Sequence, residues 1–235
     1  MGAVEAVLWM PIMAPVISLM AIGQAYSHFG TMRELRRNGH DYHLLVLGDS
    51  HSGKSTLAAQ WRRANRTLDV ESRIASLLPS VDDPTTIREA ATLSAFLTKV
   101  DGIPCRVVVW EFTAPEIFEN HSHELILQAI GGTVHGFLIC FGMDSQASLD
   151  NAVLTQSQSK ALCQAGNLPM MLCGTKYDLK KKSGRVVSQS SVKKIAHHLE
   201  LPYQCIDGRS ASQANKVVRS LLTTMNRRWK PTIVG

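Results

Sequence analysis

The sequence alternates short apolar runs with segments in which apolar residues recur at helical spacing. The apolar runs are rich in Val, Leu, Ile and Cys and are mostly continuous, which is typical of strands that are buried on both faces. An Asp-Gly pair between two of the runs predicts a tight hairpin turn. Six strands are therefore expected, at 43–47, 93–100, 105–111, 136–141, 170–173 and 203–206.

Helical spacing follows most of these runs, and the segments begin near Ser, Pro, Gln or Gly. Strands that alternate with helices predict an α/β fold, with a mostly parallel six-stranded sheet and helices on both faces. One domain of this kind is expected over 41–230, followed by a short tail at 231–235. One helix is expected to begin at residue 54, and four more are expected over 115–130, 147–165, 188–199 and 213–228.

The N-terminal segment of residues 1–40 differs in character from the rest of the chain. No Asp, Glu, Lys or Arg occurs over 6–32, and 7–23 is almost wholly apolar. About 17 to 20 helical residues nearly cross a hydrocarbon core of ~30 Å, so an N-terminal apolar helix that anchors the protein in a membrane is expected. The three arginines between 33 and 37 place the following domain in the cytosol by the positive-inside tendency. A helix on the membrane surface or packed on the domain, and a cleaved signal peptide, are the alternatives.

Composition narrows the classes of partner. The net charge of +6 arises from short groups of Lys and Arg, which solvated surface explains best, so nucleic acid is not an expected partner. Five widely spaced cysteines, several of them within apolar runs, indicate a reducing compartment, and their spacing gives no zinc motif.

A phosphate-binding loop is the strongest motif in the chain. The segment GDSHSGKS directly follows an apolar strand and satisfies the pattern G-x-x-x-x-G-K-S, with helical spacing after it. Backbone N–H groups of such a loop converge on phosphate oxygens, the lysine reaches the outer phosphates, and the final hydroxyl binds Mg²⁺. The alternative is a glycine-rich turn that matches by chance. The expected phosphate-binding residues are Gly48, Asp49, Ser50, His51, Ser52, Gly53, Lys54 and Ser55.

A second motif, GTKYDL, follows the apolar strand expected at 170–173. A carboxylate at Asp178 can accept two hydrogen bonds from the N1 and the exocyclic amine of guanine, whereas adenine offers no such pair of donors. The stem of Lys176 is expected along the base plane, and Thr175 completes the motif. Without this motif the phosphate loop is equally compatible with a kinase or ATPase, which predicts no guanine preference.

The chain resembles the Ras superfamily of small GTPases, and the Rab type most closely, over about 42–228. GDSHSGKS resembles the Rab GDSGVGKS, GTKYDL resembles GNKxDL, and VSQSSVKKIAHHLELPY resembles a Rab helix and the strand after it. The resemblance implies the P-loop GTPase fold and binding of GTP or GDP with Mg²⁺. It also implies a base-contacting loop at Asp207, Gly208 and Arg209, while the register at 210–212 stays open.

Several positions depart from the family's hydrolytic motif Asp-x-x-Gly-Gln. Glu111 stands for the aspartate and is expected to act on the magnesium side. Ala114 replaces the glycine and restricts the hinge. Pro115 replaces the glutamine that positions the attacking water, and a pyrrolidine ring has no group that can do so. Hydrolysis is therefore expected to be weak or absent and the catalytic residue is unknown, with Glu116 as the alternative water-positioning group.

The region expected to sense the γ-phosphate, 62–91, is longer than in the family and has no aromatic residue. Its Asp-Pro-Thr-Thr-Ile resembles the family's D-P-T-I, so Thr86 is the candidate Mg²⁺ ligand, with Thr85 second and a plain Asp-Pro turn as the alternative. The expected metal ligands are Ser55, Thr86 and Glu111.

The resemblance implies a molecular switch or scaffold that meets protein effectors or regulators through 62–91 and 112–131. The alternative is a pseudo-GTPase, an interaction module that does not cycle. The last cysteine precedes the C-terminus by 30 residues, so prenylation there is not expected and 7–23 is the expected membrane contact.

Overall fold

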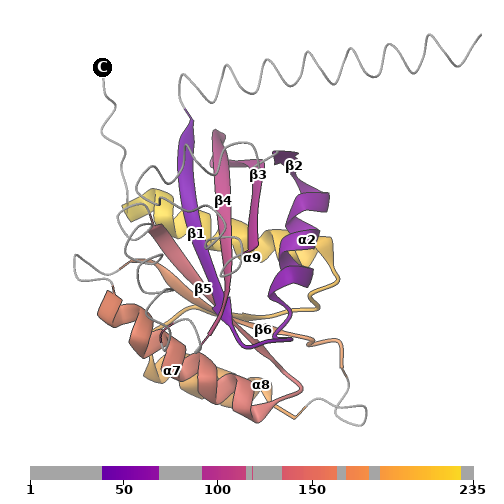
Figure 1. Ribbon diagram of the computed structural model, residues 1–235, viewed down its shortest axis with the longest axis vertical. Coiled ribbons are helices and arrows are strands. Elements are labelled where there is room, and N and C mark those ends of the chain that lie inside the picture. Colours follow the sequence, from indigo (N-terminus) through magenta and orange to yellow (C-terminus); the bar gives the residue numbers. More distant parts are fainter. Residues whose placement is uncertain are drawn as a thin grey trace, which may run out of the picture.

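The described part of the protein forms a seven-stranded sheet with helices on both faces (Figure 1). The computed structural model describes residues 39–68, 92–114, 118, 134–162, 168–179 and 186–228. The strand order is β2-β3-β4-β1-β5-β6-β7; β2, β3 and β4 pair antiparallel, and every other neighbouring pair is parallel. The predicted α/β fold with a mostly parallel sheet is thus confirmed. The strands are β1 (His40–Gly48), β2 (Arg66–Leu68), β3 (Thr92–Val100), β4 (Ile103–Thr113), β5 (Val134–Gly142), β6 (Met170–Thr175) and β7 (Tyr203–Cys205).

All six predicted strands are present, but the count of six was wrong because β2 adds a seventh at one edge. Three residues are too few to give a recognisable pattern, and β2 forms because it pairs antiparallel with β3. β1 also begins three residues earlier than expected. Polar side chains do not prevent backbone pairing there: Asp41 lies opposite Arg106 of β4, and the two side chains form an ion pair in which Arg106 Nε donates to Asp41 Oδ1 at 2.9 Å.

Among the described residues, two pairs of helices lie on opposite faces of the sheet (Figure 1). Residues of α2 and α9 share one buried cluster, and residues of α7 and α8 share another on the other side. The helix expected over 115–130 lies outside the described residues except for Phe118, which is helical and packs on the sheet. The helices are α2 (Lys54–Ala64), α7 (Gln146–Leu162), α8 (Gln189–His198) and α9 (Ala211–Arg228).

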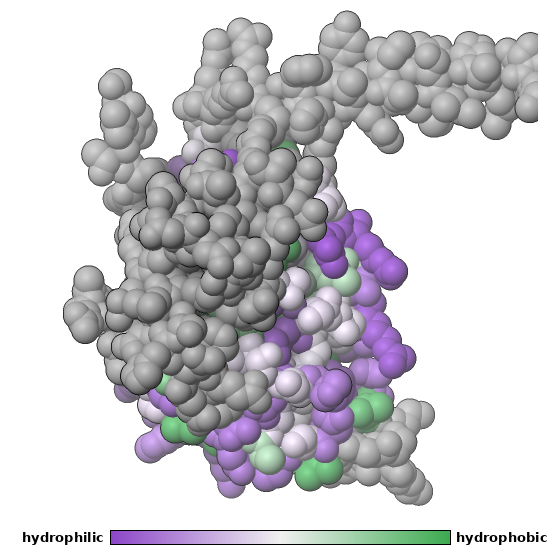
Figure 2. All heavy atoms as spheres, viewed as in Figure 1, coloured by the Kyte–Doolittle hydropathy of each residue, from purple (hydrophilic) through white to green (hydrophobic). Residues whose placement is uncertain are grey.

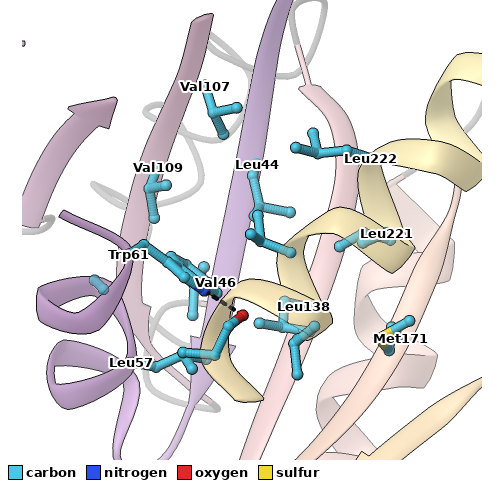
Figure 3. Packing of buried hydrophobic residues seen from close by; sticks show 14 of the residues in the cluster. Leu44, Val46, Leu57, Trp61, Val107, Val109, Leu138, Met171, Leu221 and Leu222 are labelled. Carbon is cyan, nitrogen blue, oxygen red and sulfur yellow. Dashed lines mark hydrogen bonds between the residues drawn. The ribbon is translucent and has the colours of Figure 1, made fainter. Parts of the chain in front are cut away.

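On the face of the sheet that α2 and α9 cover, the largest buried side chain is Trp61, which connects α2 with α9 (Figure 3). Its ring packs near Leu44 and Val46 of β1, and its indole Nε1 donates to the Ala214 carbonyl at 2.7 Å. Residue 57 precedes Trp61 by one helical turn, so Leu57 buries on the same side. This face therefore fixes where α2, and with it the loop that precedes α2, lies relative to the sheet.

On the face shown in Figure 2, the described residues are mainly hydrophilic, with a few apolar side chains among them. Leu154 and Val186 are the large apolar side chains that are exposed among the described residues. No helix in those ranges has the length and apolarity to cross a membrane. The predicted apolar helix at 7–23 lies outside them, as do Thr85, Thr86 and Pro115.

Candidate nucleotide-binding site

The loop after β1 approaches neighbouring backbone so closely that two of its glycines are required. Gly48 has φ 150°, and a Cβ there would lie 2.2 Å from the carbonyl oxygen of Cys140. Gly53 has φ 89°, and a Cβ there would lie 2.8 Å from Thr175 Oγ1. A side chain at either position would strain the backbone and come too close to neighbouring atoms. The two glycines of the predicted phosphate loop therefore allow it to lie against β5 and β6.

Lys54, the first residue of α2, turns back over this loop. Its side chain is buried, and its Nζ donates to the carbonyl oxygens of Gly48 at 2.7 Å and Asp49 at 2.6 Å. The ammonium is thus held beside the N-terminus of α2, where the helix dipole also favours an anion. Asn151 of α7 secures the same loop, because its Nδ2 donates to both Asp49 carboxylate oxygens at 3.0 and 3.2 Å.

The second motif is attached directly to the phosphate loop. Thr175, at the end of β6, donates its hydroxyl to the Ser52 carbonyl at 2.5 Å, and the Phe141 carbonyl lies 3.2 Å from the same oxygen. Lys176 follows with φ 58°, a left-handed conformation that turns the chain outward. Asp178 is exposed two residues later. The motif predicted to contact a base is therefore fixed in position relative to the loop predicted to hold phosphates.

The third segment, 207–209, follows β7 and joins the other two. The Tyr177 N–H donates to the Ile206 carbonyl at 3.0 Å, which connects it to the second motif. Asp207 shapes the turn: its N–H donates to Gln213 Oε1 and its Oδ1 accepts from the Arg209 N–H, both at 2.9 Å. Residues 210–212 instead lead into α9, which begins at Ala211.

All three segments line one cavity of about 520 Å³. This volume suits a small-molecule ligand. The cavity lies at the carboxyl ends of β1, β6 and β7, and ligands of open α/β sheets bind at the carboxyl ends of the parallel strands. Charges of both signs meet in it. The described lining residues are His51, Gly53, Lys54, Ser55, Thr56, Asp144, Thr175, Lys176, Asp178, Leu179, Asp207, Gly208 and Arg209. Thus most of the predicted site residues come together, while Gly48, Asp49, Ser50 and Ser52 lie in the loop without lining the cavity.

Two of the three predicted metal ligands also meet. Burial raises the pKa of the Glu111 carboxyl, and a hydrogen bond from Ser55 and the charge of Lys54 oppose that rise. Glu111 is only 6% exposed, and its Oε2 is buried without a hydrogen-bond partner among the described residues. A carboxylate oxygen left in this state fits a cation beside it. Thr86 lies outside the described residues, which contain no group of three or more His, Cys, Asp and Glu side chains suited to a metal. The Ser55 hydroxyl and the Glu111 carboxylate are oxygen donors that suit Mg²⁺, an ion that keeps several bound waters and also takes ligands from phosphates.

Sequence reasoning missed four residues of this region, one of which, Leu179, ends the second motif. Asp144 follows β5 at the same edge of the sheet, so its place after an apolar run was a usable signal. Asn151 lies within a helix and no pattern marks it. Thr56 lines the cavity because it follows Ser55 on the first turn of α2.

The fold and this cavity define an α/β nucleotide-binding domain of the P-loop class. A sequence model of the Ras family matches residues 43–227. Curated relatives include Ras-like protein 2 of Drosophila melanogaster, 22% identical over 162 residues, which are 69% of this chain and 72% of that protein. Human Ras-related protein R-Ras is 26% identical over 156 residues, 66% of this chain and 62% of its own length. Ras-related protein Rab-27B of Bos taurus is 24% identical over 196 residues, which are 81% of this chain and 82% of that protein. The chain therefore belongs to the Ras family and is a divergent small GTP-binding protein.

Proposed function

We propose that the cavity binds GDP or GTP, with the phosphates on the loop from Gly48 to Ser55 and the base between the second and third segments. The observation that carries this proposal is that Lys54, Asp178 and Gly208 line the same cavity. Lys54 supplies positive charge where phosphates would lie, and Asp178 supplies a carboxylate for the two donors of guanine. Gly208 supplies backbone at the base loop. The lining favours the register 207–209 over 210–212 for that loop.

Magnesium completes the proposed site. Ser55 and Glu111 would hold the ion, Ser55 through its hydroxyl and Glu111 through a bound water, and the unpartnered Oε2 of Glu111 supports this. Bound Mg²⁺ would neutralise charge on the outer phosphates. We include Thr86 as the third ligand from its sequence motif alone.

We further propose that hydrolysis is weak or absent, and that the protein acts as a switch or scaffold for protein partners. Pro115 supports this proposal, because it lacks the amide that positions water in the family. Partners would bind through 62–91 and 112–131, and 7–23 would hold the domain at a membrane.

The test uses the full chain, purified in a mild detergent. Chromatography of the denatured protein identifies any bound nucleotide, and added GTP with Mg²⁺ is then followed for hours. We expect bound guanine nucleotide and a turnover rate below the intrinsic rate of Ras, on the order of 10⁻⁴ s⁻¹. Pro115→Gln is the matched variant, and we expect it to hydrolyse GTP faster than the natural chain.

Two results would contradict parts of this proposal. Turnover at the intrinsic Ras rate by the natural chain would refute the role given to Pro115. A chain that contains no nucleotide and does not bind added GTP would instead support the pseudo-GTPase, in which the fold serves only as an interaction module.

A further inference from the structure

An ion pair inside the cavity joins Lys176 of the second motif to Asp144, which belongs to none of the three sequence motifs. Lys176 Nζ lies 2.7 Å from Asp144 Oδ2, and both residues line the cavity. The two side chains are 33% and 32% exposed, so solvent reaches the pair only partly. The lysine therefore does not extend freely into the space where a base would lie, because its charged end is held by Asp144.

The structure around Asp144 leaves room for this contact. A Cβ on Gly142 would lie 2.3 Å from Asp144 Oδ1 and 3.6 Å from Lys176 Nζ, so the pair occupies space that exists only because residue 142 is glycine. The adjoining backbone is fixed as well. The Met143 N–H donates to the Thr175 carbonyl at 3.0 Å, and the Ser145 N–H donates to the Gly142 carbonyl at 3.2 Å. Asp144 and Lys176 are thus carried by two loops that are hydrogen-bonded to each other.

Lys176 is restrained at its backbone as well as at its charged end. Its φ of 58° is costly for a residue with a side chain, and its carbonyl accepts from the Leu179 N–H at 3.1 Å. Asp178 lies within this short turn. A lysine fixed at both ends presents its aliphatic stem to the cavity in one orientation, so a flat apolar ligand surface meets a wall that is already formed.

We propose that Asp144 is a positioning residue for nucleotide binding, and that it acts by holding Lys176 along the face of the bound base. The inference rests on the proposed function, because it requires a base in this cavity. Partly exposed ion pairs contribute little energy and are screened by salt, so the effect is modest and depends on ionic strength.

The experiment measures the dissociation of a fluorescent GDP analogue from the full chain in excess unlabelled GDP. We expect Asp144→Asn to raise the dissociation rate about two- to fivefold at low salt. Gly142→Ala should have the same effect, because its new methyl displaces only the movable carboxylate. The control is Asp150→Asn, which removes an equal charge from an exposed position on α7. Its carboxylate accepts from Gln146, and the change should leave the rate unchanged.

A double variant with Lys176→Met shows whether Asp144 acts through Lys176 or has a general structural role. Asp144→Asn should add no further change to Lys176→Met, and raising the salt concentration should reduce the difference between the natural chain and Asp144→Asn. Acetylation of Lys176, measured by mass spectrometry without nucleotide, should be faster in Asp144→Asn because the paired ammonium is protected.

Distinct results would overturn the inference. An unchanged dissociation rate in Asp144→Asn, or a full further effect in the Lys176→Met background, would refute the role of Asp144 while leaving nucleotide binding intact. Equal acetylation rates would refute the ion pair itself. A natural chain that binds no guanine nucleotide would refute the proposed function, and the inference would fail with it.

Discussion

At the scale of single residues, the site depends on backbone positions that tolerate no side chain and on a few charges at the sheet edge. The phosphate motif could be predicted because its glycines and lysine are spaced by a fixed loop geometry. Asp144 could not be given a role in the same way, since its partner Lys176 lies 32 residues away and only the fold brings the two together. Likewise no sequence pattern shows that Asn151 would reach Asp49.

Gly53→Ala tests the close approach of the phosphate loop to Thr175. A Cβ at 2.8 Å from Thr175 Oγ1 forces the two segments apart, so we expect weaker GDP binding and a lower free energy of unfolding. Gly102→Ala is the matched control, because Gly102 has a similar φ of 82° and open space around it. It should cost only the backbone strain, about 1 kcal/mol, and leave GDP affinity unchanged. Equal losses of GDP affinity in both variants would show that the contact with Thr175 is unimportant.

His43 makes stability depend on pH. It is buried beside Trp110, whose Nε1 donates to His43 Nδ1 at 3.3 Å, a bond that requires the neutral ring. Burial, with the neighbouring His135 acting in the same direction, lowers the pKa of His43 from 6.5 to about 4. The unfolded chain therefore binds the proton more readily, so the stability that the neutral ring provides is complete above about pH 6.5 and falls as pH decreases toward 4.

The expected loss between pH 7 and pH 5 is about 2 kcal/mol in the free energy of unfolding, measured by urea denaturation. His43→Asn should remove this part of the pH dependence, since an amide can accept from Trp110 without titrating. His197→Asn, at an exposed position on α8, should retain it. A natural chain whose stability is flat from pH 7 to 5 would rule out the buried neutral histidine.

At the scale of elements, the strands that build the site could be predicted because buried parallel strands give continuous apolar runs. Their ends could not, since pairing of β1 with β4 extends through polar residues such as Asp41. β2 was missed because its three residues depend on β3 for their structure. The inner side of α7 was equally hidden from the pattern, since Thr155 and Ser159 are polar and fully buried.

The contact between α2 and α9 helps to hold in place the phosphate loop, which directly precedes α2. Trp61→Phe shrinks the buried ring and removes the indole N–H that donates to the Ala214 carbonyl, so we expect a loss of about 1–3 kcal/mol in the free energy of unfolding. Thr224→Ala is the control, since it removes an exposed hydrogen bond to the Ser220 carbonyl on the same helix. It should change stability by less than about 0.5 kcal/mol. Similar losses in the two variants would contradict the role of the Trp61 hydrogen bond.

At the scale of the whole molecule, three segments far apart in the sequence meet at one end of the sheet. Parallel strands explain this convergence, because the carboxyl ends of β1, β6 and β7 lie at the same edge. The motifs predicted which residues carry the chemistry, and the topology explains why they share a cavity. Net charge and composition predicted none of this, because charges of both signs line the cavity.

The central claim is that this cavity recognises guanine, and calorimetric titration of the full chain with GDP in Mg²⁺ tests it most directly. Asp178→Asn replaces the carboxylate that would accept both guanine donors, so the account predicts a dissociation constant for GDP that is roughly 10- to 100-fold higher. Asp150→Asn, which changes the same charge on an exposed part of α7, should bind GDP like the natural chain. Unchanged GDP affinity in Asp178→Asn, or ADP binding as tight as GDP in the natural chain, would contradict the account.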